Sequence, residues 1–198
     1  MSKTRRLAYL ALILAAFIWG VAPIVIKHTL NFISPVNFLF YRFLFASMII
    51  AIPLYFRIKK IKPSKKEWLD YAFLGFLCTP FNLLLLFFGI AKTTAIDASL
   101  ISITAPFLVA IGGAMFLKEN VTKIEKIGIL IAVFGTLITI AQPLFENIGN
   151  IGGQIGGNLL VFLGTLVWVA FTLLAKKKKN LDPFILSSFS FLVGLIVF

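Results

Sequence analysis

The sequence predicts an all-α integral membrane protein, on the evidence of its composition, the length of its apolar runs and the placement of its charges. Of its 198 residues, 60% are hydrophobic and 13% are charged, and the mean hydropathy is +1.02. A soluble domain carries about a quarter charged residues, so an ordinary soluble domain is excluded. Because lipid cannot hydrogen-bond the backbone, each apolar run that crosses a bilayer must be a helix.

Apolar runs define the expected spans, because a bilayer core of about 30 Å takes about 20 helical residues to cross. The second run is interrupted by Arg42, and the seventh reaches Phe198. In chain order the runs cover residues 7–26, 35–56, 71–91, 98–117, 127–143, 157–175 and 183–198. Each of the seven is predicted to be one helix.

Helix-start signals support several of these boundaries. An N-cap residue followed by proline favours a helix start, and so does Ser or Thr followed three residues later by Glu. The signals are Ser34–Pro35, Ser64 with Glu67, Thr122 with Glu125, and Asp182–Pro183. They place starts before the second, third, fifth and seventh runs.

The net charge of +12 predicts the orientation in the membrane. With the N-terminus inside the cell, most lysines and arginines fall in the cytoplasmic segments, namely the N-terminal segment, 57–66, 118–126 and 176–179. The external segments contain only Lys27 and Lys92. Cytoplasmic segments of membrane proteins carry an excess of Lys and Arg. We therefore expect a multi-pass plasma-membrane protein with a cytoplasmic N-terminus, and no nucleic acid as a partner.

A weak internal repeat relates the end of the chain to its beginning. A shift of 149 residues places Trp19 on Trp168 and Lys27 on Lys176. The sixth and seventh runs also follow the order of the first and second, so the repeat unit is five spans. An odd number of spans inverts the second copy in the membrane, as in many secondary transporters.

The repeat predicts the organisation of the chain. We expect a first five-helix repeat at 1–145, an external glycine-rich linker at 146–156 and the beginning of a second, inverted repeat at 157–198. The linker is expected to be a flexible join. On this plan about 6.5 to 7 spans of an expected total of about 10 are present.

Short motifs distributed over the whole chain carry a family resemblance. They are Trp19–Gly20, Lys27, Ser34–Pro35, Arg42, Ala98–Ile101, Pro106, Phe116–Glu119, Gly128, Gly135 and Leu163–Trp168. With these motifs the sequence resembles the EamA-type branch of the drug/metabolite transporter superfamily. The resemblance implies two inverted five-span repeats. The chain departs from it in length, and on this resemblance we expect a truncation at the C-terminal side.

Polar residues inside the runs are candidates for a substrate site. Arg42 lies roughly 10 Å along its helix from the external end. An intramembrane charge costs at least about 2.5–3.5 kcal/mol, so Arg42 either attracts a substrate anion, snorkels outward or pairs with Asp97 at the entrance of the fourth span. Asp97 is also the nearest candidate for a coupling-proton site, although a helix N-terminus stabilises its anion.

Other candidates come from spacing and from position in the repeats. Ser99, Ser102 and Pro106 recur on one side of the fourth run and predict either a cavity wall or a packing face. Trp19 and Trp168 lie at related positions in the two repeats and either face a central cavity or pack. The full set of cavity candidates is Trp19, Tyr41, Arg42, Asn82, Ser99, Ser102, Pro106 and Trp168, with Asp97 as ion-pair partner.

Enzyme chemistry is not expected, because the sequence lacks a nucleophile elbow, a P-loop, an HExxH motif and paired intramembrane carboxylates. We predict no catalytic residue, no cofactor and no metal. The resemblance implies a secondary transporter that exports a small metabolite, such as an amino acid or related organic ion, by alternating access. The alternative is a non-transporting membrane subunit, or an inactive fragment, that packs against another chain. The expected partners are the lipid bilayer and a small-molecule substrate; a coupling ion and a homo-oligomer stay open.

Overall fold

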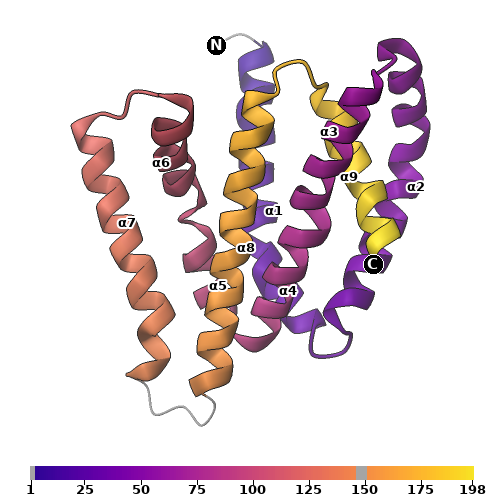
Figure 1. The fold of residues 1–198 in the computed structure, drawn as a ribbon. Coiled ribbons are helices and arrows are strands. Elements are labelled where there is room, and N and C mark those ends of the chain that lie inside the picture. The colour runs from indigo at the N-terminus through magenta and orange to yellow at the C-terminus, as the bar shows by residue number, and fades with distance from the viewer. Residues whose placement is uncertain (1–2, 146–150) are drawn as a thin grey trace.

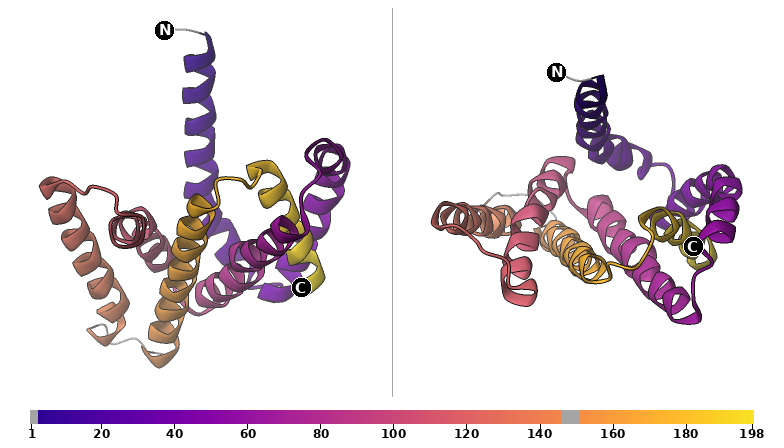
Figure 2. Two further views of the ribbon diagram at one scale, coloured as in Figure 1. Left: turned by 45° about the horizontal axis from the view of Figure 1, so that its top comes forward. Right: turned by 90° about the horizontal axis from the view of Figure 1, so that it is seen from above.

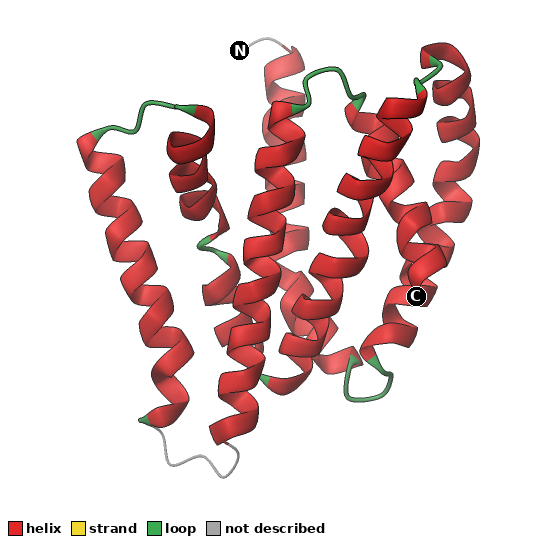
Figure 3. Ribbon diagram, viewed as in Figure 1, coloured by secondary structure: helices red, strands yellow, loops and turns green. Residues whose placement is uncertain are grey.

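The computed structural model describes residues 3–145 and 151–198, and the regular structure within these ranges is helical (Figure 3). The elements are α1 (Lys3–Thr29), α2 (Pro35–Ile61), α3 (Lys65–Phe76), a π-helical turn η1 (Leu77–Phe81), α4 (Asn82–Lys92), α5 (Ala95–Ser102), α6 (Ala105–Leu117), α7 (Lys123–Ala141), a 3₁₀ turn η2 (Gln142–Leu144), α8 (Ile151–Lys177) and α9 (Pro183–Val197).

The described residues contain six helical segments that are long and apolar enough to cross a membrane, and α9 is a shorter apolar helix. The third segment comprises α3, η1 and α4, and the fourth comprises α5 and α6. The predicted all-α membrane fold is thus confirmed. The fourth run is not one helix, however, because it divides into α5 and α6.

Local capping explains where the helices begin. Ser34 accepts a hydrogen bond from the backbone N–H of Asn37 at the start of α2. Complete capping boxes join Ser64 to Glu67 and Thr122 to Glu125 at the starts of α3 and α7. Each box satisfies two backbone donors that the first helical turn leaves without a partner. The predicted start signals are therefore confirmed.

Figure 1 shows that the helices alternate in direction. The start of α1 lies at one end of the bundle with the connections that follow α2, α6 and α8. We call this the basic end, because the lysine-rich segments lie there, and the other the opposite end. In the same view α8 runs in the opposite direction to α1, and α9 in the opposite direction to α2.

Helix α8 occupies the centre of the bundle. It packs against α4, α5, α6 and η1, whereas α9 packs against α2 and α3. Seen from the end of the bundle, the N-terminal part of α1 stands apart from the other helices (Figure 2), while its C-terminal part contacts α4 and α5. Its apolar side chains are largely exposed, in contrast to Val161 on α8, which is fully buried.

The predicted linker differs from the structure. Residues 151–156 lie within α8, since this helix begins at Ile151. The remaining linker residues, 146–150, lie outside the described residues. Glycines favour a flexible chain only where no neighbour orders them, and here α8 packs closely along α4. The sixth helical segment thus begins earlier than the apolar run predicts.

Candidate functional site

Two of the spans, which we call the interrupted spans, depart from regular α-helix near the middle of the bundle. The third stays helical through a π-helical turn, and the fourth breaks between two helices. In the third span, η1 contains Pro80. In the fourth, α5 ends at Ser102 and α6 begins at Ala105, directly before Pro106. Proline has no backbone N–H and cannot continue the ladder of i to i−4 hydrogen bonds. Broken spans form substrate sites in many secondary transporters, and π-helical turns occur frequently at functional sites, so these two positions define the candidate site.

The break between α5 and α6 has a defined hydrogen-bond pattern. The backbone N–H of Ile103 donates to the carbonyl of Ser99 at 3.0 Å, and that of Thr104 donates to Ile101 at 3.2 Å. The Thr104 hydroxyl donates to the same Ile101 carbonyl at 2.6 Å. Because Pro106 lacks an N–H, the carbonyl of Ser102 has no i+4 donor. The break therefore provides a backbone acceptor inside the membrane.

Helix α8 lies between the two interrupted spans (Figure 1) and approaches α4 very closely. A Cβ atom added to Gly89 would lie 2.8 Å from the backbone N of Val161. One added to Gly157 would lie 2.9 Å from the backbone of Thr93, and one added to Gly164 3.1 Å from that of Leu86. Small residues allow such close backbone contact in membranes. The glycines of α8 thus place it directly against the third span.

Asn82, the first residue of α4, connects the third span to α8. Its side chain is buried, and Nδ2 donates to the carbonyl oxygen of Gly164 at 2.6 Å. The sequence marked Asn82 as a cavity candidate, but its partner could not be predicted, because Gly164 is 82 residues away. In this conformation the amide serves the contact between the third span and α8.

A buried polar cluster lies at the opposite end, where α4, α5 and α8 meet. It consists of Thr93, Asp97, Gln154 and Asn158. Asp97 Oδ2 accepts hydrogen bonds from Gln154 Nε2 at 3.0 Å and from Thr93 Oγ1 at 3.2 Å. Thr93 Oγ1 also contacts Asn158 Oδ1, and Asn158 Nδ2 donates to the Thr139 carbonyl at 3.2 Å. The sequence pointed only to Asp97 here.

Arg42 and Asp97 are not joined in the described structure. The guanidinium of Arg42 lies 5.7 Å from the ring centre of Phe43 and 6.0 Å from that of Phe87. The ion pairs found among the described residues do not include it. Arg42 is exposed in the described structure, and a cation placed over aromatic faces is attracted by them. The two rings therefore stabilise Arg42, and Asp97, one of the partners that the sequence suggested, does not pair with it.

The other candidates are dispersed in this conformation. The Ser99 hydroxyl donates to the Ala95 carbonyl of its own helix at 2.7 Å. Trp19 is 69% exposed and Tyr41 52%. Two apolar hollows, of about 360 and 340 Å³, are lined by other residues. Ser102 is half-buried, and Pro106 and Trp168 are exposed.

Ion pairs join α8 and α9 to the preceding spans at the basic end. They are Arg57–Asp182 and Lys176–Glu119, each at 2.6 Å, and Lys178–Asp70 at 2.8 Å. The sequence prediction used these lysines and acids only for topology. A signal was nevertheless available, because the acid and the base of each pair were assigned to the same side of the membrane.

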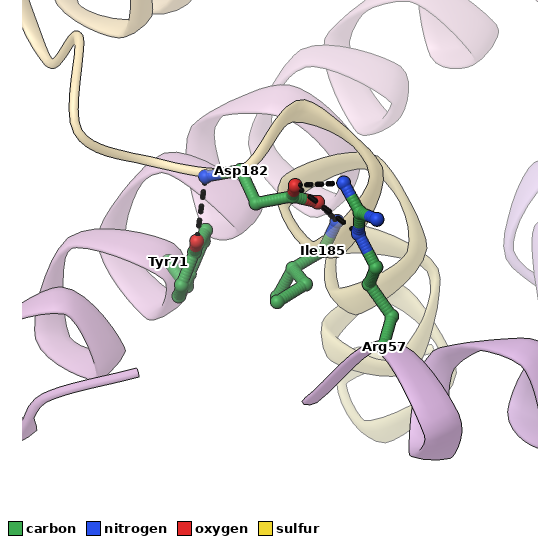
Figure 4. A network of polar contacts seen from close by, with 4 residues as sticks. All are labelled: Arg57, Tyr71, Asp182 and Ile185. Atoms are coloured by element: carbon green, nitrogen blue, oxygen red, sulfur yellow. Dashed lines mark hydrogen bonds and ion pairs between the residues drawn. The ribbon is translucent and has the colours of Figure 1, made fainter. Parts of the chain in front are cut away.

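Asp182 is the most connected of these acids (Figure 4). Its Oδ2 accepts from Arg57 Nε at 3.2 Å and Nη2 at 2.6 Å, while Oδ1 accepts from the Ile185 N–H at 3.0 Å. The Asp182 backbone N–H donates to the Tyr71 hydroxyl at 2.8 Å. The hydrogen bond from Arg57 holds the pKa of Asp182 below its ordinary value. One residue thus caps α9 and joins it to α2 and α3.

Comparisons with known proteins agree with this architecture. A model described as the EamA-like transporter family matches residues 6–141. The chain is 30% identical over 174 residues to the "Uncharacterized transporter YyaM" of Bacillus subtilis (strain 168), covering 86% of this chain and 56% of the relative. It is 28% identical over 189 residues to an "Uncharacterized transporter" of Archaeoglobus fulgidus, covering 95% of this chain and 64% of the relative.

The chain therefore spans between about half and two thirds of the length of these curated relatives, 56% of one and 64% of the other. No solved structure is significantly similar to it. The arrangement of the interrupted spans around α8 is therefore described here from this chain alone. Because the family model covers more than half of the chain, the chain belongs to the EamA-like transporter family.

Proposed function

We propose that the chain forms the first repeat and the beginning of the second repeat of a secondary transporter that moves a small metabolite across the plasma membrane. The observation that carries this proposal is that α8 lies between two spans that are both interrupted near their middle. Interrupted spans at a repeat interface supply backbone acceptors and helix ends for a ligand. The repeats are 1–145 and 157–198 on the boundaries predicted from the sequence, and helix α8 begins at Ile151.

The mechanism is alternating access between the two repeats. Two separate contacts hold α8 and α9 against the preceding spans: the ion pairs at the basic end and the buried polar cluster at the opposite end. Opening one contact while the other stays closed exposes the interrupted spans to one side at a time. The opposed directions of α1 and α8 support an inverted relationship between the repeats (Figure 1).

The substrate class is an amino acid or related organic ion, and the direction is export. Arg42 supports an anionic group on the substrate, because it is a cation within a span and no acid pairs with it among the described residues. A transported carboxylate attracted to Arg42 would replace the ring contacts with a charge-assisted hydrogen bond. The cluster of lysines supports a cytoplasmic basic end.

A counterflow assay on the full-length protein tests this function. Proteoliposomes are preloaded with unlabelled amino acids or organic acids, one at a time, and uptake of the labelled compound is measured against protein-free liposomes. We expect accumulation of at least one carboxylate-bearing compound. Correctly inserted protein that moves none of them would favour the alternative, a non-transporting subunit that packs against another chain.

A further inference from the structure

An apolar hollow lies between the third span and α8, at the surface of the bundle. Its volume is about 360 Å³. The side chains that line it are all apolar: Leu77, Phe81, Leu85, Leu163, Leu166, Val167 and Ala170. We call it the η1–α8 hollow. Phe81, Leu163 and Leu166 are 42%, 47% and 37% exposed, so the hollow is open to the membrane, whose hydrocarbon chains are as apolar as its walls.

The size of the hollow favours a single hydrocarbon chain over a helix as its occupant. One helical turn, about 10 Å across and about 5.4 Å long, occupies roughly 420 Å³, which exceeds the volume of the whole hollow. A helix could lie across the hollow but could not enter it, whereas an acyl chain is narrow enough to do so. The hollow lies near the middle of the spans Lys65–Lys92 and Gly152–Lys177, so a chain that reaches it extends from the headgroup region to the centre of the bilayer.

An ion pair joins the two walls at the basic end, above the hollow. Lys178 Nζ on the loop after α8 lies 2.8 Å from Asp70 Oδ1 and 2.9 Å from Asp70 Oδ2 on α3. Two further lysines flank this pair. Lys66 lies one helical turn before Asp70, and Lys177 lies next to Lys178. The mouth of the hollow at the basic end is therefore bordered by a lysine on each helix.

Both lysines are in register with the hollow. Lys66 precedes Leu77 by eleven residues, and Lys177 follows Leu166 by eleven residues. Eleven residues make three helical turns to within about 20°, so each lysine lies on the helix face that lines the hollow. They lie about 16 Å along the helix axis from it, and half of a bilayer core of about 30 Å is about 15 Å. The two lysines are therefore at the depth of lipid phosphate groups when the hollow is at the midplane.

The charge around this mouth is positive. Residues 65–70 and 177–179 contain five lysines and two acids, a net charge of +3. Both acids already have partners: Asp70 pairs with Lys178, and Glu67 caps α3 and accepts a hydrogen bond from Asn180 at 3.2 Å. Lys66 and Lys177 are exposed, and the ion pairs found among the described residues do not include them. Basic pockets between membrane helices bind anionic lipid headgroups.

We propose that the η1–α8 hollow, together with Lys66 and Lys177, is a binding site for one anionic phospholipid. The phosphate lies between the two lysines, and one acyl chain runs along α3 and α8 into the hollow. Phe73 and Leu174 are exposed apolar side chains between the lysines and the hollow, one on each helix, and line this path. A lipid bound in this way contacts the third span and α8 together and stabilises their contact. The site does not depend on the proposed transport function.

Native mass spectrometry of the full-length protein in detergent tests the headgroup contacts. The probe is an equimolar mixture of dioleoyl phosphatidylglycerol and dioleoyl phosphatidylcholine. We expect the anionic lipid to bind at least fivefold more often than the zwitterionic lipid. The double variant Lys66→Gln with Lys177→Gln should reduce this preference at least fivefold, because each lysine near a lipid surface contributes about a factor of five. Lys60→Gln with Lys123→Gln is the matched control, since it removes two exposed lysines from α2 and α7, which do not line the hollow.

A second pair of variants tests the acyl-chain contact. Ala170→Phe fills the hollow and should reduce phosphatidylglycerol binding at least fivefold although both lysines remain. Ala72→Phe is its control at an exposed position of α3 outside the hollow. Melting temperatures in lipid-free detergent identify any variant that is misfolded.

Three results overturn the proposal: equal binding of the two lipids by the wild type, equal preference in the two lysine double variants, or unchanged binding by Ala170→Phe. Glycerol phosphate, which carries the headgroup without a chain, should not displace the lipid. Displacement by it at equal concentration would show a site for free phosphate compounds instead of a lipid site.

Discussion

Arg57 Nη2 lies 2.6 Å from Asp182 Oδ2, across 125 residues of sequence. The pair joins the basic end of α2 to the first turn of α9, and the same carboxylate caps α9 through the Ile185 N–H. A charged acceptor that receives several donors forms stronger hydrogen bonds than a neutral one. This residue pair therefore holds the start of α9 against α2.

Replacement of Asp182 by Ala should lower the free energy of unfolding by about 1 kcal/mol or more, because loss of an N-cap alone costs about 0.5–2 kcal/mol. Asp182→Asn should cost less, since its side-chain oxygen can still accept from Ile185. Thermal unfolding in detergent measures both, and Lys60→Ala is the control at an exposed lysine of α2. Additive effects of Arg57→Ala and Asp182→Ala in the double variant would contradict the pairing.

The stability supplied by Asp182 should depend on pH. Because Arg57 lowers the pKa of Asp182 in the folded state, the folded state binds this proton less readily than the unfolded state. The contribution is complete above the ordinary Asp value of about 3.9 and is lost as pH falls through the lowered pKa. We expect the difference in melting temperature between wild type and Asp182→Asn to be constant near neutral pH and to shrink in acid. A constant difference down to strongly acidic pH would exclude this linkage.

Gly157→Ala should separate α8 from α4. The added Cβ would lie 2.9 Å from the backbone of both Lys92 and Thr93, and backbone atoms cannot rotate away. Forced overpacking costs typically about 1–3 kcal/mol. Gly156→Ala is the matched control on the same helix, since its Cβ meets nothing within 4 Å, and a helical Ala is favoured over Gly by up to about 1 kcal/mol. Unfolding curves with equal shifts for the two variants would refute the close contact.

Arg42→Ala should reduce counterflow of a carboxylate substrate about tenfold or more, because about 1.4 kcal/mol of lost attraction corresponds to a tenfold weaker affinity. Arg42→Lys should retain part of the activity, and Lys123→Ala at an exposed position of α7 should have no effect. Membrane insertion, measured by protein content of the membrane fraction, is the control for folding. Unchanged transport by Arg42→Ala would remove the proposed role in substrate binding.

Sequence alone predicted the spans and their starts, because both depend on local properties. A long apolar run must be helical in lipid whatever its neighbours are, and the pairs Ser64 with Glu67 and Thr122 with Glu125 form their capping boxes within one turn. The interruption of the fourth span was only partly predictable. Pro106 has no backbone N–H, so it leaves the carbonyl of the residue four positions earlier without its helical donor. The division into two helices also depends on the Thr104 hydroxyl, which donates to the carbonyl of Ile101.

The polar cluster and the ion pairs depend on which helices meet, and this could not be predicted from local patterns. Asp97 and Arg42 were expected on the same side of the membrane, which made a pair between them reasonable. Packing instead places Asn158 of α8 beside Thr93, and Phe43 and Phe87 beside Arg42. Residues 151–156 were predicted as part of a flexible linker, whereas they form the first turns of α8, where Gln154 donates a hydrogen bond to Asp97 of α5.

The central claim is that the contacts at the two ends of α8 open alternately. Paired distance measurements between spin labels test it most directly, in full-length protein with Cys78 replaced by Ala. One label pair, Ile96 and Gly152, spans the opposite end, and the other, Leu69 and Lys179, spans the basic end; all four positions are exposed. On addition of a transported substrate we predict that one distance increases while the other decreases. Distances that stay fixed, or that change together in the same direction, would contradict alternating access.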